Sequence, residues 1–104
     1  MNDLANVRAA RYWTERAEKS TDPAEAQRFY RIAAEGYATT VRETDRQYDT
    51  SRGVYAINAL RAAALSGDRA FALSLAAEYT GAAFVPSPFT AKVLGEMAAK
   101  LRAA

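Results

Sequence analysis

The chain has 104 residues, of which half are apolar and a quarter charged, and its formal net charge is +2 at pH 7. This size suits one globular domain with one core, and it leaves no room for a second. The 14 basic residues are diluted by 12 acidic ones, whereas nucleic-acid-binding proteins carry clustered basic residues, so we expect no nucleic acid partner.

The residue types that are missing narrow the possible chemistry. The sequence contains no cysteine and no histidine, which excludes disulfides and thiolate metal sites and removes the commonest general base. We therefore expect a protein that is not an enzyme and holds no cofactor or metal ion. The chain opens without a basic segment followed by an apolar run, and no apolar stretch is long enough to span a membrane. These features predict a cytoplasmic protein, either a whole chain or a piece of a longer one.

The first predicted element is an amphipathic helix over residues 3–19. Its apolar side chains recur at helical spacing, and they are Leu4, Val7, Ala10, Trp13 and Ala17. We expect Trp13 to be the main anchor of this helix.

The second predicted helix begins at Asp22-Pro23 and runs to about Thr44. Aspartate caps a helix, proline fits the first helical position, and Glu25 completes a box-like cap. Its apolar stripe consists of Ala26, Phe29, Tyr30, Ile32, Ala33, Tyr37 and Val41.

Residues 45–51 are polar and predict a connection, after which a third helix begins near Arg52. The apolar face of that helix is predicted at Val54, Ile57, Leu60 and Ala64. Gly67 then ends this helix and Asp68 caps a fourth one over residues 69–80. Two helices joined by so short a turn must fold back antiparallel.

Two prolines make residues 82–88 a loop, in which we expect two apolar residues, Phe84 and Val85, to pack inward. Ser87 and Pro88 then start a closing helix, whose predicted stripe is Phe89, Val93, Met97 and Leu101. Lys100 and Arg102 suit the negative C-terminal end of that helix. The sequence thus predicts an all-α fold of two antiparallel helical hairpins and a C-terminal closing helix, formed by residues 1–104 as one domain.

A weak internal repeat supports the two-hairpin interpretation. Ile32-Ala33-Ala34-Glu35 matches Leu75-Ala76-Ala77-Glu78 after a shift of 43 residues. Small alanines on facing helices let backbones approach closely, as they do in stacked hairpin repeats.

The second hairpin also resembles a known family. Residues 64–68 (Ala-Leu-Ser-Gly-Asp), followed by Ala72, Leu75 and Ala76, resemble the turn and following alanine of tetratricopeptide repeats. Residues 55–59 (Tyr-Ala-Ile-Asn-Ala), together with the same turn, look like the repeats of TRAFs-binding scaffold domains. The resemblance implies a protein-binding module, in which the first helix of each hairpin lines a concave surface that grips a peptide or a partner helix.

On that implied surface the second hairpin would present Val54, Asn58 and Arg61. An Asn and an Arg one helical turn apart can grip a backbone amide and a carboxylate, although they also fit a plain solvated face, which is the simpler interpretation. Tyr48 and Tyr55 would add an aromatic patch suited to a protein partner. The alternatives are a self-associating helical bundle, with a homodimer as its product, and a small-ligand-binding domain.

Two groups of carboxylates are candidate chemical sites. Glu43, Asp45 and Asp49 lie close in sequence and could bind a divalent cation, but their spacing matches no calcium loop. Glu35 and Glu78, which the repeat relates, could approach each other if the hairpins stack. A solvated surface accounts for both groups more simply.

Overall fold

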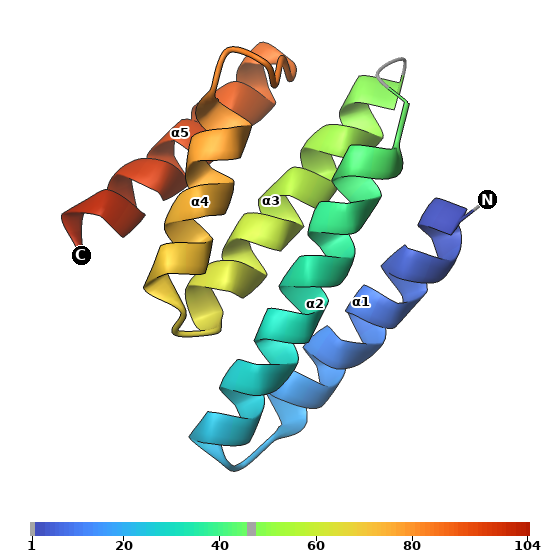
Figure 1. The fold of residues 1–104 in the computed structure, drawn as a ribbon, viewed down its shortest axis with the longest axis vertical. Coiled ribbons are helices and arrows are strands. Elements are labelled where there is room, and N and C mark those ends of the chain that lie inside the picture. Colours follow the sequence, from blue (N-terminus) through green and yellow to red (C-terminus); the bar gives the residue numbers. More distant parts are fainter. Residues whose placement is uncertain (1, 46–47) are drawn as a thin grey trace.

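The described part of the chain, residues 2–45 and 48–104 in this computed structural model, consists of helices and connections without a strand. The helices are α1 (Asn2–Lys19), α2 (Pro23–Glu43), α3 (Asp49–Leu65), α4 (Arg69–Thr80) and α5 (Pro88–Ala103). Successive helices run in opposite directions (Figure 1). The predicted all-α fold of antiparallel hairpins with a closing helix is therefore confirmed.

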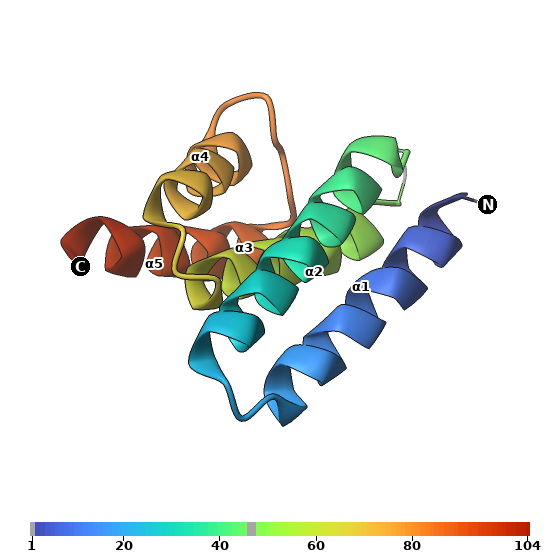
Figure 2. The ribbon, with the colours of Figure 1, turned by 60° about the horizontal axis from the view of Figure 1, so that its bottom comes forward.

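The helices form two layers. The molecule measures 38 × 37 × 19 Å, and its thickness is about two helix diameters. In the view down the shortest axis, α2 and α4 lie in front of α3 and α5 (Figure 1). After rotation, α4 stands above α3 and α5, while α2 lies between α1 and α3 (Figure 2). One layer therefore contains α1, α3 and α5, and the other contains α2 and α4.

The first hairpin follows the predicted boundaries. Asp22 caps α2 by accepting a hydrogen bond from the backbone N–H of Ala24 at 3.1 Å. The box-like role of Glu25 was wrong, because its carboxylate accepts from the Ser20 hydroxyl instead, at 3.0 Å. Trp13 lies half-buried with its ring 5.1 Å from that of Phe29, so it joins α1 to α2 at the edge of the core.

The buried residues of α1 are small. They are Val7, Ala10 and Ala17. The side chain of Leu4, which the sequence places on the same stripe, lies outside the described residues.

The third helix begins earlier than the sequence predicts. It starts at Asp49, not near Arg52, so residues 49–51 belong to its first turn. An aspartate in the first turn interacts favourably with the helix dipole, and this interaction replaces a side-chain cap, which Tyr48 does not supply. Of the predicted connection, residues 46–47 lie outside the described chain.

The buried face of α3 also differs from the predicted stripe. Val54 and Ala64 are exposed, whereas the buried positions are Gly53, Ala56, Ala59, Leu60, Ala62 and Ala63. The reason is that α3 contacts α2, α4 and α5, and close contact on several sides requires small residues. The predicted stripe is therefore right at Leu60, which is buried, and at Ile57, which packs against the core, and wrong at Val54 and Ala64.

The turn between α3 and α4 is confirmed in detail. Gly67 has a φ of +77°, a conformation that side-chain-bearing residues rarely adopt. Asp68 caps α4 by accepting from the backbone N–H of Phe71 at 3.0 Å. The apolar face of α4 is buried at Ala72, Leu75, Ala76 and Tyr79.

The closing helix is rotated relative to the prediction. Its fully buried residues are Leu94 and Ala98, whereas Phe89 is 75% exposed. Of the two loop residues expected to pack inward, Phe84 does so against Tyr79, with ring centroids 5.2 Å apart, but Val85 is exposed. The core accepts one large side chain from the loop, because neighbouring residues of an extended segment point in opposite directions.

Alternate helices run parallel. Arg31 of α2 forms an ion pair with Asp68, which caps α4, and Arg42 of α2 forms one with Glu78 of α4 at 3.2 Å. The partners are 37 and 36 residues apart. The residues that face each other on α2 and α4 are thus separated by fewer residues than the 43-residue shift of the internal repeat.

Candidate functional site

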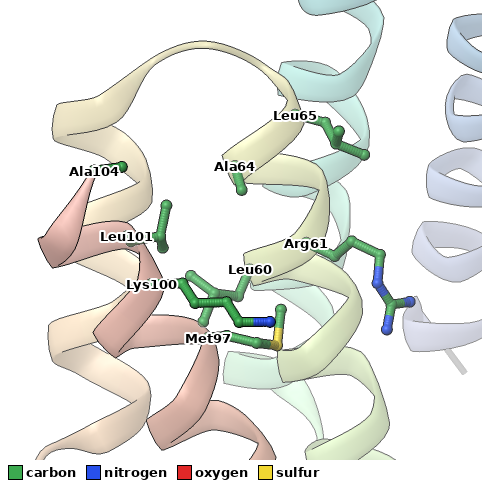
Figure 3. A pocket seen from close by; sticks show the side chains of 8 residues that line it. All are labelled: Leu60, Arg61, Ala64, Leu65, Met97, Lys100, Leu101 and Ala104. Carbon is green, nitrogen blue, oxygen red and sulfur yellow. The ribbon is translucent and has the colours of Figure 1, made fainter.

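An apolar groove lies between α3 and α5, on the layer that also contains α1 (Figure 3). We call it the α3–α5 groove, and its volume is about 470 Å³. Its lining residues are Leu60, Arg61, Ala64 and Leu65 of α3, with Met97, Lys100, Leu101 and Ala104 at the end of α5. Leu60 is fully buried and forms the floor, whereas Leu65 is 50% exposed. The groove is therefore open to solvent.

Two cations border this groove in different ways. The side chain of Lys100 extends from α5 toward α3 beside Met97, whereas Arg61 points away from α5 toward α1 (Figure 3). A lysine stem can cover apolar surface while its ammonium group stays in water. Lys100 therefore covers part of the apolar floor and places its charge over the opening.

A second, smaller hollow lies on the other side of α3. We call it the α1–α3 furrow, and it has a volume of about 130 Å³. Its lining residues are Thr14 and Glu18 of α1, Tyr30 and Tyr37 of α2, and Asn58, Arg61, Ala62 and Leu65 of α3. Arg61 and Leu65 line both hollows, so they form a ridge between them.

The structure places two of the predicted binding residues of α3, Asn58 and Arg61, in the α1–α3 furrow. Asn58 lines the α1–α3 furrow, and Arg61 donates a hydrogen bond to its side-chain oxygen at 3.4 Å. Val54 lies one turn before Asn58 and is half exposed. These three residues and Leu65 have the spacing of one helical stripe.

The two tyrosines do not join that stripe. Tyr55 is half-buried and packs against the core, while Tyr48 is exposed at the start of α3. Neither lines the α3–α5 groove or the α1–α3 furrow. Tyr48 and Tyr55 therefore form no aromatic patch beside Asn58 and Arg61, because Tyr55 packs against the core. The tyrosines that line the α1–α3 furrow with Asn58 and Arg61 are Tyr30 and Tyr37 of α2.

The α5 half of the groove was missed by the sequence reasoning. The sequence predicts Met97 and Leu101 on the apolar stripe of the closing helix, and in the structure both pack against the core but stay only partly buried. The available signal was the neighbouring pair Leu94 and Ala98, which has the same spacing and fills the core instead. A helix with two adjacent apolar stripes has more apolar surface than one core contact can cover.

The carboxylate groups are not gathered into a metal site. Among the described residues, no three acidic side chains lie close enough together to hold a metal ion. Glu43 accepts a hydrogen bond from the Asn6 amide at 3.1 Å. Glu35 and Glu78 do not meet, because Glu35 pairs with Arg31 and Glu78 pairs with Arg42.

One titratable group is strongly perturbed, and it lies in the core outside both hollows. Burial raises the pKa of the Tyr79 phenol well above its usual value, and the charge of Glu78 raises it further, while Arg42 lowers it. The Tyr79 hydroxyl has no hydrogen-bond partner in the described structure.

Within the described residues, no helix combines the length and apolar character needed to cross a membrane. No protein-family model, no curated protein and no solved structure matches this chain. The resemblance to tetratricopeptide repeats therefore stays a prediction, and what the chain does must be inferred from its own surface.

Proposed function

We propose that the chain is a protein-interaction module that binds a peptide or a partner helix on the face formed by α1, α3 and α5. The observation that carries this proposal is the α3–α5 groove, where apolar side chains of two helices are left open to solvent. Exposed apolar surface rimmed by charged residues is typical of interaction sites.

The composition of the groove favours binding over catalysis. Its lining consists of leucine, alanine, methionine, one arginine and one lysine. Arg61 cannot act as a general base, because a guanidinium group keeps its proton in proteins. A small-ligand site needs several convergent polar groups to fix the orientation of its ligand, and Arg61 points away from this groove (Figure 3). An extended protein surface is the better fit.

We also propose that the helices are stacked as in tetratricopeptide repeats. The proposal is supported by the parallel course of α2 and α4, whose ion-paired residues are 36 and 37 residues apart. The family repeats about every 34 residues. In that arrangement α1 and α3 are the first helices of their hairpins, which line the concave binding surface.

Site-specific photocrosslinking in the source cells tests the proposed function. A photoreactive phenylalanine analogue replaces Val54 or Leu65, which are both half exposed on the α3 stripe. The matched control carries the analogue at Lys92, an exposed position of α5 outside the groove. We expect adducts with a partner protein at positions 54 and 65 and none at 92.

Two other results would argue against a partner protein on this face. Adducts between two copies of the chain at the same positions would favour the self-associating alternative. Equal labelling at all three positions, or none at 54 and 65, would contradict the assignment of this face as the binding surface.

A further inference from the structure

The cations of the described chain differ in whether they have counter-charges: Arg31 and Arg42 do, whereas Arg28, Arg69 and Lys100 form no ion pair. On the layer of α2 and α4, Arg31 pairs with Asp68 and Arg42 pairs with Glu78. On the opposite layer, Lys100 makes no ion pair within the described chain, and no aspartate or glutamate side chain lines the α3–α5 groove. The Lys100 ammonium group therefore borders the groove without an acidic side chain as its partner.

The acidic side chains near the groove do not neutralise Lys100 by forming an ion pair with it. Glu18 lines the α1–α3 furrow with Arg61, and Glu96 lies one turn before Lys100 on α5. Neither carboxylate forms an ion pair with any described residue. A carboxylate brought by a partner would meet the unpaired Lys100 ammonium group at the edge of an apolar surface, which gives charge complementarity together with apolar burial.

The lining also indicates the conformation of the occupant. An extended peptide exposes backbone N–H groups, and these need acceptors when they are buried. The lining side chains of the groove offer no amide, hydroxyl or carboxylate oxygen to accept such bonds. A helix satisfies its own backbone internally, so it can enter an apolar groove without that cost.

The dimensions suit a short helical contact. The α3 side of the groove extends from Leu60 to Leu65, and the α5 side extends from Met97 to Ala104, which is about two helical turns. The opening therefore accommodates two apolar side chains that lie three or four residues apart on a partner helix.

We propose that the α3–α5 groove binds an amphipathic helix of a partner protein, whose apolar stripe is flanked by glutamate or aspartate. The apolar side chains occupy the floor at Leu60 and Met97, and a flanking carboxylate pairs with Lys100. This inference depends on the proposed function and adds to it the chemistry and conformation of the partner.

Designed peptides of about 18 residues, long enough to form a helix alone, provide the probe. Each carries two leucines four residues apart, flanked by glutamate, by glutamine or by lysine on an otherwise identical alanine-rich background. Fluorescence anisotropy measures their binding to the full chain. We expect the glutamate peptide to bind about tenfold more tightly than the glutamine peptide and the lysine peptide to bind weakest.

Variants of the chain locate the contact. Lys100→Glu should weaken the glutamate peptide about tenfold and improve the lysine peptide, whereas the control Lys92→Glu should change neither. Leu65→Ser removes a half-exposed apolar side chain and should weaken all three peptides without unfolding the chain, which circular dichroism checks.

Three results would overturn the inference. The first is equal binding of the glutamate and glutamine peptides, and the second is undiminished binding to Lys100→Glu. The third is equal binding of a proline-substituted glutamate peptide that cannot form a helix. If any of these occurs while the photoreactive analogue at position 65 still crosslinks to a partner protein in cells, the proposed function stands. Only the inference that the partner contributes an acidic amphipathic helix is then wrong.

Discussion

Gly53 of α3 lies against Thr90 of α5, so closely that a Cβ atom on the glycine would be 2.9 Å from the threonine methyl carbon. This contact joins the N-terminal parts of two parallel helices, and further along, the same pair of helices borders the α3–α5 groove. The spacing of α3 and α5, and therefore the opening of the groove, depends on the missing side chain at position 53.

We predict that Gly53→Ala destabilises the chain by about 1–2 kcal/mol. Alanine is intrinsically favoured over glycine inside a helix by about 1 kcal/mol. Helix propensity alone would therefore predict that Gly53→Ala stabilises the chain, whereas the contact with Thr90 predicts that it destabilises the chain. The branched Thr90 side chain has few alternative rotamers with which to avoid the new methyl group. Urea denaturation followed by circular dichroism gives the free energy of unfolding.

The control for this prediction is a double substitution. Thr90→Ser removes the methyl carbon that the new Cβ would strike, while it keeps the hydroxyl that accepts from Ser87. We expect Gly53→Ala to cost less in the Thr90→Ser background than in the native chain. An equal cost in both backgrounds would mean that another contact limits position 53.

Gly95, in the middle of α5, should respond in the opposite way. A Cβ atom added there meets nothing within 4 Å, so only the intrinsic preference of the helix for alanine remains. We predict that Gly95→Ala raises the free energy of unfolding by about 0.5–1 kcal/mol. A decrease in the same urea titration would contradict the packing described around α5.

Asp68 combines two roles that substitutions can separate. Its carboxylate caps α4 by accepting a hydrogen bond from the backbone N–H of Phe71, and it also forms an ion pair with Arg31 of α2. We predict that Asp68→Ala lowers the free energy of unfolding by about 1–2 kcal/mol, because it removes the cap. Asp68→Asn keeps a capping oxygen and should cost less than about 1 kcal/mol, since both ion-paired side chains are more than a third exposed.

Salt dependence distinguishes these two roles of Asp68. The cost of Asp68→Asn should shrink in about 0.5 M NaCl, because salt screens exposed ion pairs, whereas most of the cost of Asp68→Ala should remain. Glu96→Gln is the matched control, since this exposed carboxylate forms no ion pair in the described chain. A salt-independent cost for Asp68→Asn would assign the effect to the cap alone.

The order of the helices was predictable because their ends carry local signals. Asp22-Pro23, Gly67-Asp68 and Ser87-Pro88 act through their own backbone geometry and capping groups, so no knowledge of distant residues is needed. The start of α3 lacks such a signal, since Tyr48 provides no capping side chain. This is the boundary that the sequence placed wrongly.

The rotation of the helices was less predictable. On α3 the core is formed mainly by glycine and alanine, which contribute little to an apolar pattern but allow close approach of neighbouring helices. On α5 two apolar stripes compete, and only packing determines that Leu94 enters the core while Met97 borders a groove.

The candidate site was predictable on one side only. Asn58 and Arg61 belong to a single helix, so their shared face follows from spacing. The opposite wall, with Lys100, comes from a helix distant in sequence, and its placement depends on tertiary packing. The apolar floor of the groove and the position of the Lys100 charge over it both depend on two helices, so the sequence of one helix cannot predict them.

Tyr79 provides a last prediction, because its hydroxyl is buried without a hydrogen-bond partner in the described structure. An unsatisfied buried polar group costs about 1–3 kcal/mol, so Tyr79→Phe should raise the free energy of unfolding by about 1 kcal/mol while it keeps the ring contact with Phe84. A loss of stability would indicate that the hydroxyl has a partner, such as a buried water molecule.

The pH dependence of the same variant gives an independent check. Burial raises the pKa of the folded Tyr79 phenol above that of the unfolded chain, which is about 10. Above this pH the unfolded state loses a proton that the folded state keeps, so stability falls by up to about 1.4 kcal/mol per pH unit until the folded phenol ionises. Tyr79→Phe removes this contribution, and its free energy of unfolding should therefore decline less steeply above pH 10 than that of the native chain. Parallel declines in urea titrations across that range would show that the Tyr79 phenol is no more difficult to ionise in the folded chain than in the unfolded one.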